Sequence, residues 1–97
     1  MQFLSFSRRK SESFTDAQFA AKTPDEWQRA RALYAEGTIR QLWARGDTPG
    51  ACILWEAENE QQARELIGSL PMAQAGMLEI IAVVPLKPYP GFSASNR

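Results

Sequence analysis

The chain has 97 residues with 11 basic and 11 acidic side chains, so it carries no net charge. A neutral chain lacks the positive field that attracts nucleic acids and anionic membranes, and neither is expected as a principal partner. Histidine is absent, which removes the commonest metal ligand and excludes Ser-His and Cys-His catalytic pairs. We therefore expect no metal site.

The chain is expected to be a soluble cytoplasmic protein. Its N-terminal basic residues follow a very short apolar run instead of preceding a long one, which is unlike a signal peptide. The longest apolar run, near IIAVVPL, is too short to cross a bilayer. The single cysteine, Cys52, excludes an intramolecular disulfide and fits a reducing compartment, where it would be an inert apolar residue. The length predicts one domain over residues 1–97.

The first half of the chain predicts a strand followed by a helix. Residues 2–7 are rich in Phe and Leu and predict a strand, and residues 8–22 predict a polar connection with a helical turn near residues 16–20. The segment TPDEW is typical of a helix start, with Thr23 as the N-cap and Glu26 completing a capping box. The helix should end at Gly37, a natural C-terminal stop.

A hairpin and a second helix are predicted next. Residues 38–44 and 51–57 are two strands around the turn RGDTPG, and each strand carries a Trp. Asn59 is a good N-cap for an amphipathic helix that Pro71 should stop.

The last predicted strand has apolar side chains in both alternating sets. It spans residues 77–84, with Leu78, Ile80, Ala82 and Val84 in one set and Met77, Ile81 and Val83 in the other. The Pro-rich residues 85–97 form a tail, whose Tyr89 and Phe92 predict that it docks on a protein surface.

The order β-α-β-β-α-β predicts an α+β, ferredoxin-like fold, an antiparallel four-stranded sheet with both helices on one face. The other face would then be bare. A last strand that is apolar on both sides should be buried on both sides, so this second face of the sheet must pack against something. The same face of a second copy of the chain would serve. We therefore predict a homodimer built as a dimeric α+β barrel.

The segment EGTIRQLW resembles the muconolactone delta-isomerase family. The residues that carry the resemblance are Glu36, Gly37, Thr38, Arg40, Leu42 and Trp43, and the helix that ends in Leu70–Pro71 is similar too. The resemblance implies a cofactor-independent isomerisation of a small apolar or lactone ligand of aromatic catabolism by proton transfer, in a homodimer or a dimer-based oligomer. The chain departs from the family in having MAQAGM after Pro71 and no histidine. These departures favour an alternative, a non-catalytic dimeric domain with a ligand-binding or structural role.

Proton transfer next to a lactone carbonyl needs a base and a group that stabilises the enolate. Without histidine, the leading candidates for the base are Glu26, which matches an acidic position of the family, and Glu79, which lies in an apolar strand. Each could instead have a purely structural role. Glu26 could cap a helix, and Glu79 could reach the sheet edge or pair with an arginine. Arg40 could stabilise the enolate or form a surface ion pair.

Several aromatic and polar residues are candidates to line the ligand pocket: Gln41, Trp43, Trp55, Tyr34, Phe3 and Phe6. Aromatic residues at strand spacing more often fill a core. Gln41 and Trp43 share one face of their strand, and Arg40 and Leu42 share the other. The pattern leaves open which face meets the cavity, since a shift of one residue exchanges them.

Overall fold

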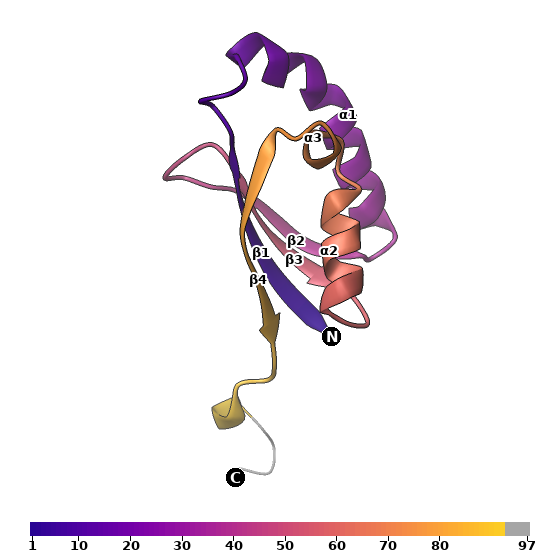
Figure 1. The fold of residues 1–97 in the computed structure, drawn as a ribbon. Helices are drawn as coiled ribbons and strands as arrows, with labels where there is room; N and C mark the ends of the chain where they lie inside the picture. The colour runs from indigo at the N-terminus through magenta and orange to yellow at the C-terminus, as the bar shows by residue number, and fades with distance from the viewer. Residues whose placement is uncertain (93–97) are drawn as a thin grey trace.

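The computed structural model describes residues 1–92 of the chain. Its four strands form one sheet. Figure 1 shows the helices gathered on one side of this sheet. The elements in chain order are β1 (Gln2–Arg9), α1 (Asp16–Ala35), β2 (Ile39–Ala44), β3 (Ala51–Glu56), α2 (Glu60–Gly68), α3 (Pro71–Gln74), β4 (Leu78–Leu86) and the 3₁₀ turn η1 (Pro90–Phe92).

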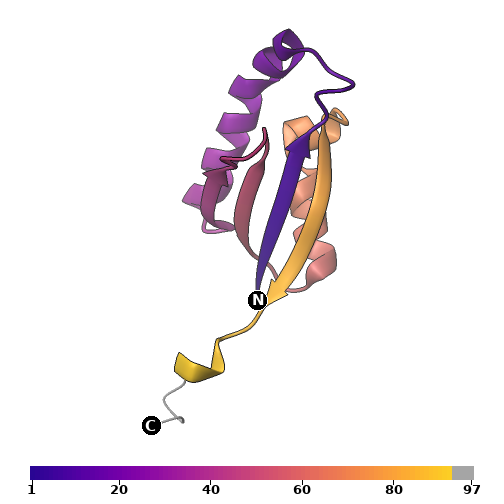
Figure 2. The same cartoon turned by 90° about the vertical axis from the view of Figure 1, so that its left-hand side faces the viewer.

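The sheet has the order β2-β3-β1-β4, and every neighbouring pair is antiparallel. Figure 2 shows the same arrangement from the side. The predicted α+β fold with the ferredoxin-like strand order is therefore confirmed. Among residues 1–92, no helix combines the length and apolar character needed to cross a membrane.

The start of α1 corrects the sequence-based prediction. The helix begins at Asp16, where the Thr15 hydroxyl accepts the Gln18 N–H at 3.2 Å and the Gln18 side chain accepts the Thr15 N–H at 2.8 Å. Thr23 is not a cap, because its hydroxyl donates to the Phe19 carbonyl at 2.8 Å inside the helix. The segment TDAQ forms its own capping box, and burial of Phe19 favours helix over these turns.

Pro24 consequently lies inside α1 instead of at its first position. A proline within a helix removes one backbone hydrogen bond and crowds the preceding turn, which bends the helix. In Figure 1 the first turns of α1 run across the top of the view before the helix descends along the sheet. The predicted end is confirmed, since Gly37 adopts a φ of 85° directly after the helix.

The helix-covered face of the sheet holds the main core. Its largest fully buried side chains include Trp55, Phe3, Leu33 and Ile39. Ser5 is buried among them, and its hydroxyl accepts the indole N–H of Trp55 at 2.9 Å. This hydrogen bond satisfies two polar groups that would otherwise be costly to bury.

The second helix begins as predicted, because the Asn59 side chain accepts the Gln62 N–H at 2.8 Å. After α2 ends at Gly68, Pro71 occupies the first turn of the short helix α3. Pro71 therefore starts a new helix, a position where proline needs no backbone N–H.

The predicted alternation of β4 is wrong because the β1–β4 ladder contains a bulge. Ser5 pairs with Val83, whereas Ser7 pairs with Ile80, so one extra residue of β4 lies between these pairs. Val83 and Ile80 therefore both face the helices, and Ile81 is 52% exposed.

The opposite side of the sheet, the open face, is not covered by any described element. It presents mainly apolar side chains, with a few polar ones: Leu4, Phe6, Arg8, Gln41, Trp43, Cys52, Leu54, Glu79, Ile81, Ala82, Val84 and Leu86. The tail extends away from the sheet (Figures 1 and 2), with Tyr89 68% and Phe92 89% exposed. The predicted docking of the tail is not seen within one chain over residues 85–92, and residues 93–97 lie outside the described part.

Candidate active site

A cavity of about 210 Å³ lies between α1 and the helix-covered face of the sheet. Most of its wall is apolar, and Trp27 of α1 and Trp43 of the edge strand β2 both contribute to it. Its polar lining is small and comes from three residues: Ser7 and Arg9 of β1 and Glu26 of α1. An apolar cavity with a few convergent polar groups is the usual form of a small-molecule site.

Glu26 is the carboxylate of this cavity. Its side chain is half-buried and accepts the backbone N–H of Met72 at 2.9 Å. Burial raises the pKa of the Glu26 carboxyl above its ordinary value, while the Met72 hydrogen bond and the charge of Arg9 oppose part of the rise. The raised pKa makes ionised Glu26 a stronger base than a solvated carboxylate.

Glu26 also has a structural contact that the sequence did not predict. The N-cap residue of α3 is Leu70, whose side chain makes no capping hydrogen bond, and the Met72 N–H lies in the first turn of this helix. Glu26 therefore caps α3 across 46 residues of sequence instead of capping its own helix. The expected capping box at Thr23 and Glu26 is wrong, because α1 continues through both residues.

Arg9 is the cation of the cavity, and sequence reasoning missed it by treating residues 8–22 as a solvated connection. β1 continues to Arg9, whose backbone pairs with Leu78 of β4. Every second side chain of β1 faces the helices, from Phe3 through Ser5 and Ser7 to Arg9. Extending this alternation by one step beyond the predicted strand would have placed Arg9 in the site.

The hairpin turn closes one side of the cavity against β1. The Ser7 hydroxyl accepts the Ala51 N–H at 3.2 Å, and the Ser7 carbonyl accepts a hydrogen bond from Arg45 at 3.2 Å. Gly50 approaches so closely that an added Cβ would lie 2.1 Å from the Ser7 oxygen. Only glycine fits at this point of the wall.

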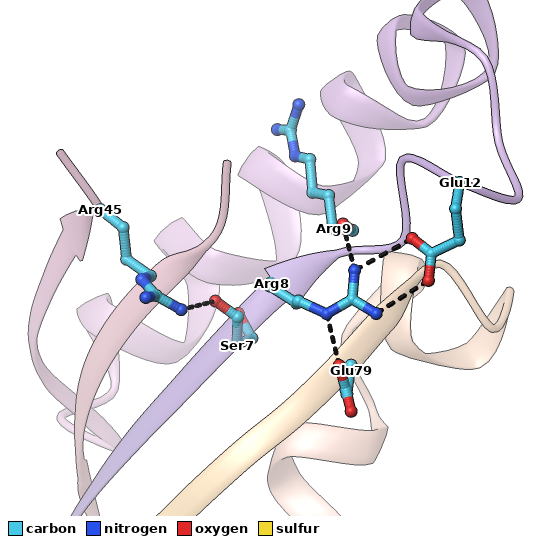
Figure 3. Close-up of polar contacts among 6 residues, drawn as sticks. All are labelled: Ser7, Arg8, Arg9, Glu12, Arg45 and Glu79. Carbon is cyan, nitrogen blue, oxygen red and sulfur yellow. Dashed lines mark hydrogen bonds and ion pairs between the residues drawn. The ribbon is translucent and has the colours of Figure 1, made fainter. Parts of the chain in front are cut away.

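Glu79 lies on the open face, away from the cavity. It forms an ion pair with Arg8, which also binds Glu12 with N–O distances of 2.8 and 3.0 Å (Figure 3). Arg8 and Arg9 are adjacent, so their side chains project to opposite faces of β1. The structure thus separates Glu79 from Glu26 by the thickness of the sheet.

Arg40 also lies outside the cavity. The β2–β3 ladder has a register shift between Ile39 and Gln41, and Arg40 is the extra, exposed residue of this bulge. Gln41 pairs with Leu54 of the open face. Because of this bulge, strict alternation along the strand could not predict which face of the sheet Arg40 and Gln41 occupy.

The predicted aromatic lining divides into three groups. Trp43 borders the cavity, but its pairing with Cys52 places its side chain on the open face. Phe3 and Trp55 are core residues with 1% and 0% exposure. Tyr34 is 58% exposed and lies with Trp27 in a shallow apolar groove beside the cavity. Trp27 belongs to the linings of both the groove and the cavity and so links them.

Two solved structures share this fold. A crystal structure of muconolactone isomerase matches with a TM-score of 0.77 and 21% identity, covering 97% of this chain and 95% of that chain. A 5-chloro-2-hydroxyhydroquinone dehydrochlorinase from Burkholderia phenoliruptrix AC1100, in complex with 2,5-dihydroxybenzoquinone, matches with a TM-score of 0.61 and 19% identity, covering 90% and 94%.

None of the curated protein sequences compared with the chain matches it. The family model described as muconolactone delta-isomerase matches residues 1–91, which is nearly the whole chain. This match agrees with the resemblance of the EGTIRQLW segment and with the strand order of the sheet. The chain therefore belongs to the muconolactone delta-isomerase family.

Proposed function

We propose that the protein isomerises a small lactone by cofactor-independent proton transfer, with Glu26 as the base. The observation that carries this proposal is a half-buried carboxyl in an apolar cavity, in a chain of the muconolactone delta-isomerase family. The cavity, at about 210 Å³, is smaller than pockets for drug-sized molecules and suits a single small ring.

The chemistry is a transfer of one proton between two carbons of the ligand. Ionised Glu26 takes the proton from a carbon conjugated with the lactone carbonyl, and the electron pair of the broken C–H bond moves into the enolate. The protonated carboxyl then returns the proton to another carbon of the same conjugated system. No oxidant, reductant or water is consumed, and one residue serves as base and then as acid.

The surroundings of Glu26 favour this reaction. Trp27 and Leu42 present apolar surfaces to a flat ring, and the largely apolar wall limits hydration of the carboxylate. Arg9 adds positive charge to the cavity. Of the two carboxylates considered from the sequence, Glu26 keeps the role of the base, because Glu79 lies on the open face.

A second candidate function is a non-catalytic domain that binds a small apolar ligand. The contact between Glu26 and Met72 favours it, because one carboxylate oxygen is already engaged in capping α3. In this alternative Glu26 serves only to hold α1 and α3 together.

The two functions differ in what Glu26→Gln does. Glutamine keeps the size of the side chain and an oxygen that accepts the Met72 N–H, so α3 stays capped while the base is lost. We expect this variant to fold normally and to lose at least about 10²-fold in turnover of muconolactone, followed by ultraviolet absorbance. Glu79→Gln is the matched control and should keep the parent rate.

A Glu26→Gln variant as fast as the parent would exclude the carboxylate mechanism. If the parent itself turns over neither muconolactone nor methyl-substituted analogues, the ligand-binding alternative replaces the isomerase.

A further inference from the structure

Two adjacent arginines of β1 have different surroundings. Arg8 binds Glu12 and Glu79 on the open face, so its charge is neutralised by carboxylates of the same chain (Figure 3). Arg9 projects the other way and lines the cavity. Within residues 1–92, Arg9 is not among the ion pairs.

The guanidinium of Arg9 is held in place by an aromatic ring. It lies 5.3 Å from the ring centroid of Phe19, a distance typical of a cation–π contact. Phe19 is 4% exposed and packs with Met72 and Met77, so the ring is itself fixed. The backbone of Arg9 is anchored as well, since its N–H donates to the Pro49 carbonyl at 2.9 Å.

Arg9 and Glu26 occupy different parts of the cavity wall. Phe19 and Glu26 are seven residues apart on α1, which corresponds to about 10 Å along a helix axis. The Arg9 guanidinium contacts Phe19, whereas Glu26 lies about two turns further along α1 and contacts Met72. A charge held beside Phe19 suits an anionic group carried by the ligand.

We propose that Arg9 is a specificity-determining residue of the cavity, which binds a negatively charged substituent of the ligand at the end away from Glu26. The substituent is a small oxyanion such as a carboxylate, whose planar geometry matches the guanidinium fork. The inference rests on the proposed function, because that function defines the reacting end of the ligand as the end next to Glu26.

The test is a binding measurement that needs no turnover. Muconolactone and its carboxamide are titrated into the protein, and binding is followed by the fluorescence of Trp27 in the cavity wall. We expect the parent to bind the carboxylate about 10- to 100-fold more tightly than the neutral amide, the range for a hydrogen bond to a charged group. Arg9→Gln should bring the two affinities together, while affinity for the amide stays near that of the parent.

Arg8→Gln is the matched control, because it removes the same charge one residue away on the opposite face. It should retain the preference of the parent for the carboxylate. Circular dichroism verifies that each variant folds, and the ratio of the two affinities in the parent tests the inference without any variant.

Equal affinities in the parent, no detectable binding of the carboxylate, or a preference that survives Arg9→Gln would each overturn the inference. A parent that shows the preference but no turnover would contradict the proposed isomerase and leave Arg9 as the anion-binding residue. The two hypotheses therefore fail in distinguishable ways.

Discussion

Both faces of the four-stranded sheet are largely apolar, yet the helices cover only one. On the helix-covered face Phe3, Trp55 and Ile39 are each at most 1% exposed, whereas Trp43, Ile81 and Val84 on the open face are 41–52% exposed. The covered face contains both a packed core and a cavity with a carboxyl of raised pKa. Apolar character in a strand therefore predicts burial, but whether that burial occurs within one chain depends on the elements that pack against the strand.

We propose that a second copy of the chain covers the open face, and its disruption should give the largest effect. Val84→Lys places a charge on this face and should convert a dimer into a folded monomer, measured by light scattering at micromolar concentration. Val83→Lys, one residue away, places the same charge on the helix-covered face, where Val83 is 9% exposed, and should unfold the chain. A parent protein that is a stable monomer would contradict the proposal.

The next effect concerns the wall of the cavity. Gly50→Ala forces a Cβ to within 2.1 Å of the Ser7 carbonyl oxygen, so β3 or β1 must shift. We expect a loss of about 1–3 kcal/mol in the free energy of unfolding, the usual cost of overpacking, measured by urea denaturation. Gly46→Ala is the control in the same turn, because no atom lies within 4 Å of its added Cβ. Similar stabilities for the two variants would mean that the hairpin turn does not press on β1.

The first turns of α1, which place Phe19 beside Arg9, depend on the cap at Thr15. Thr15→Ala removes the oxygen that accepts the Gln18 N–H, and should cost about 1 kcal/mol of stability in a thermal melt. Thr23→Ala removes only a hydroxyl bonded within the helix and should cost less. The reverse order would place the true start of α1 at Thr23.

The smallest expected effect is a difference in how Glu26 and Glu12 make the stability of the protein depend on pH. Because the folded-state pKa of Glu26 is raised, its ionisation opposes folding. The stability that the neutral Glu26 carboxyl contributes is complete below its unfolded-state pKa near 4.5. It is lost as pH rises through its raised folded-state pKa. Glu12 behaves oppositely: Arg8 lowers its pKa to about 2, so its contribution is present above 4.5 and is lost as pH falls toward 2.

Thermal melts between pH 2 and pH 8 should resolve these two contributions. Glu26→Gln should flatten the stability profile above pH 4.5, and Glu12→Gln should flatten it below. Profiles that both variants leave unchanged would mean that neither carboxyl changes its pKa on folding.

The number, type and order of the main elements follow from local sequence signals, because hydrophobic periodicity and turn residues act over a few neighbouring positions. The cap at Asn59 and the stop at Gly37 are examples, since each depends on residues within four positions of it. Glu26 could be proposed from its family match, and Trp43 from its strand.

The start of α1 and the faces of the strands depend on contacts between distant parts of the chain. Two capping boxes compete for α1, and the choice depends on burial of Phe19 against Met72 and Met77, more than 50 residues away. The bulges in β2 and β4 shift side chains between faces, and a bulge arises from pairing between strands instead of from either strand alone. Long-range packing likewise brings Glu26 of α1 to the face of β1 that carries Arg9, while β4 places Glu79 beside Arg8 on the open face.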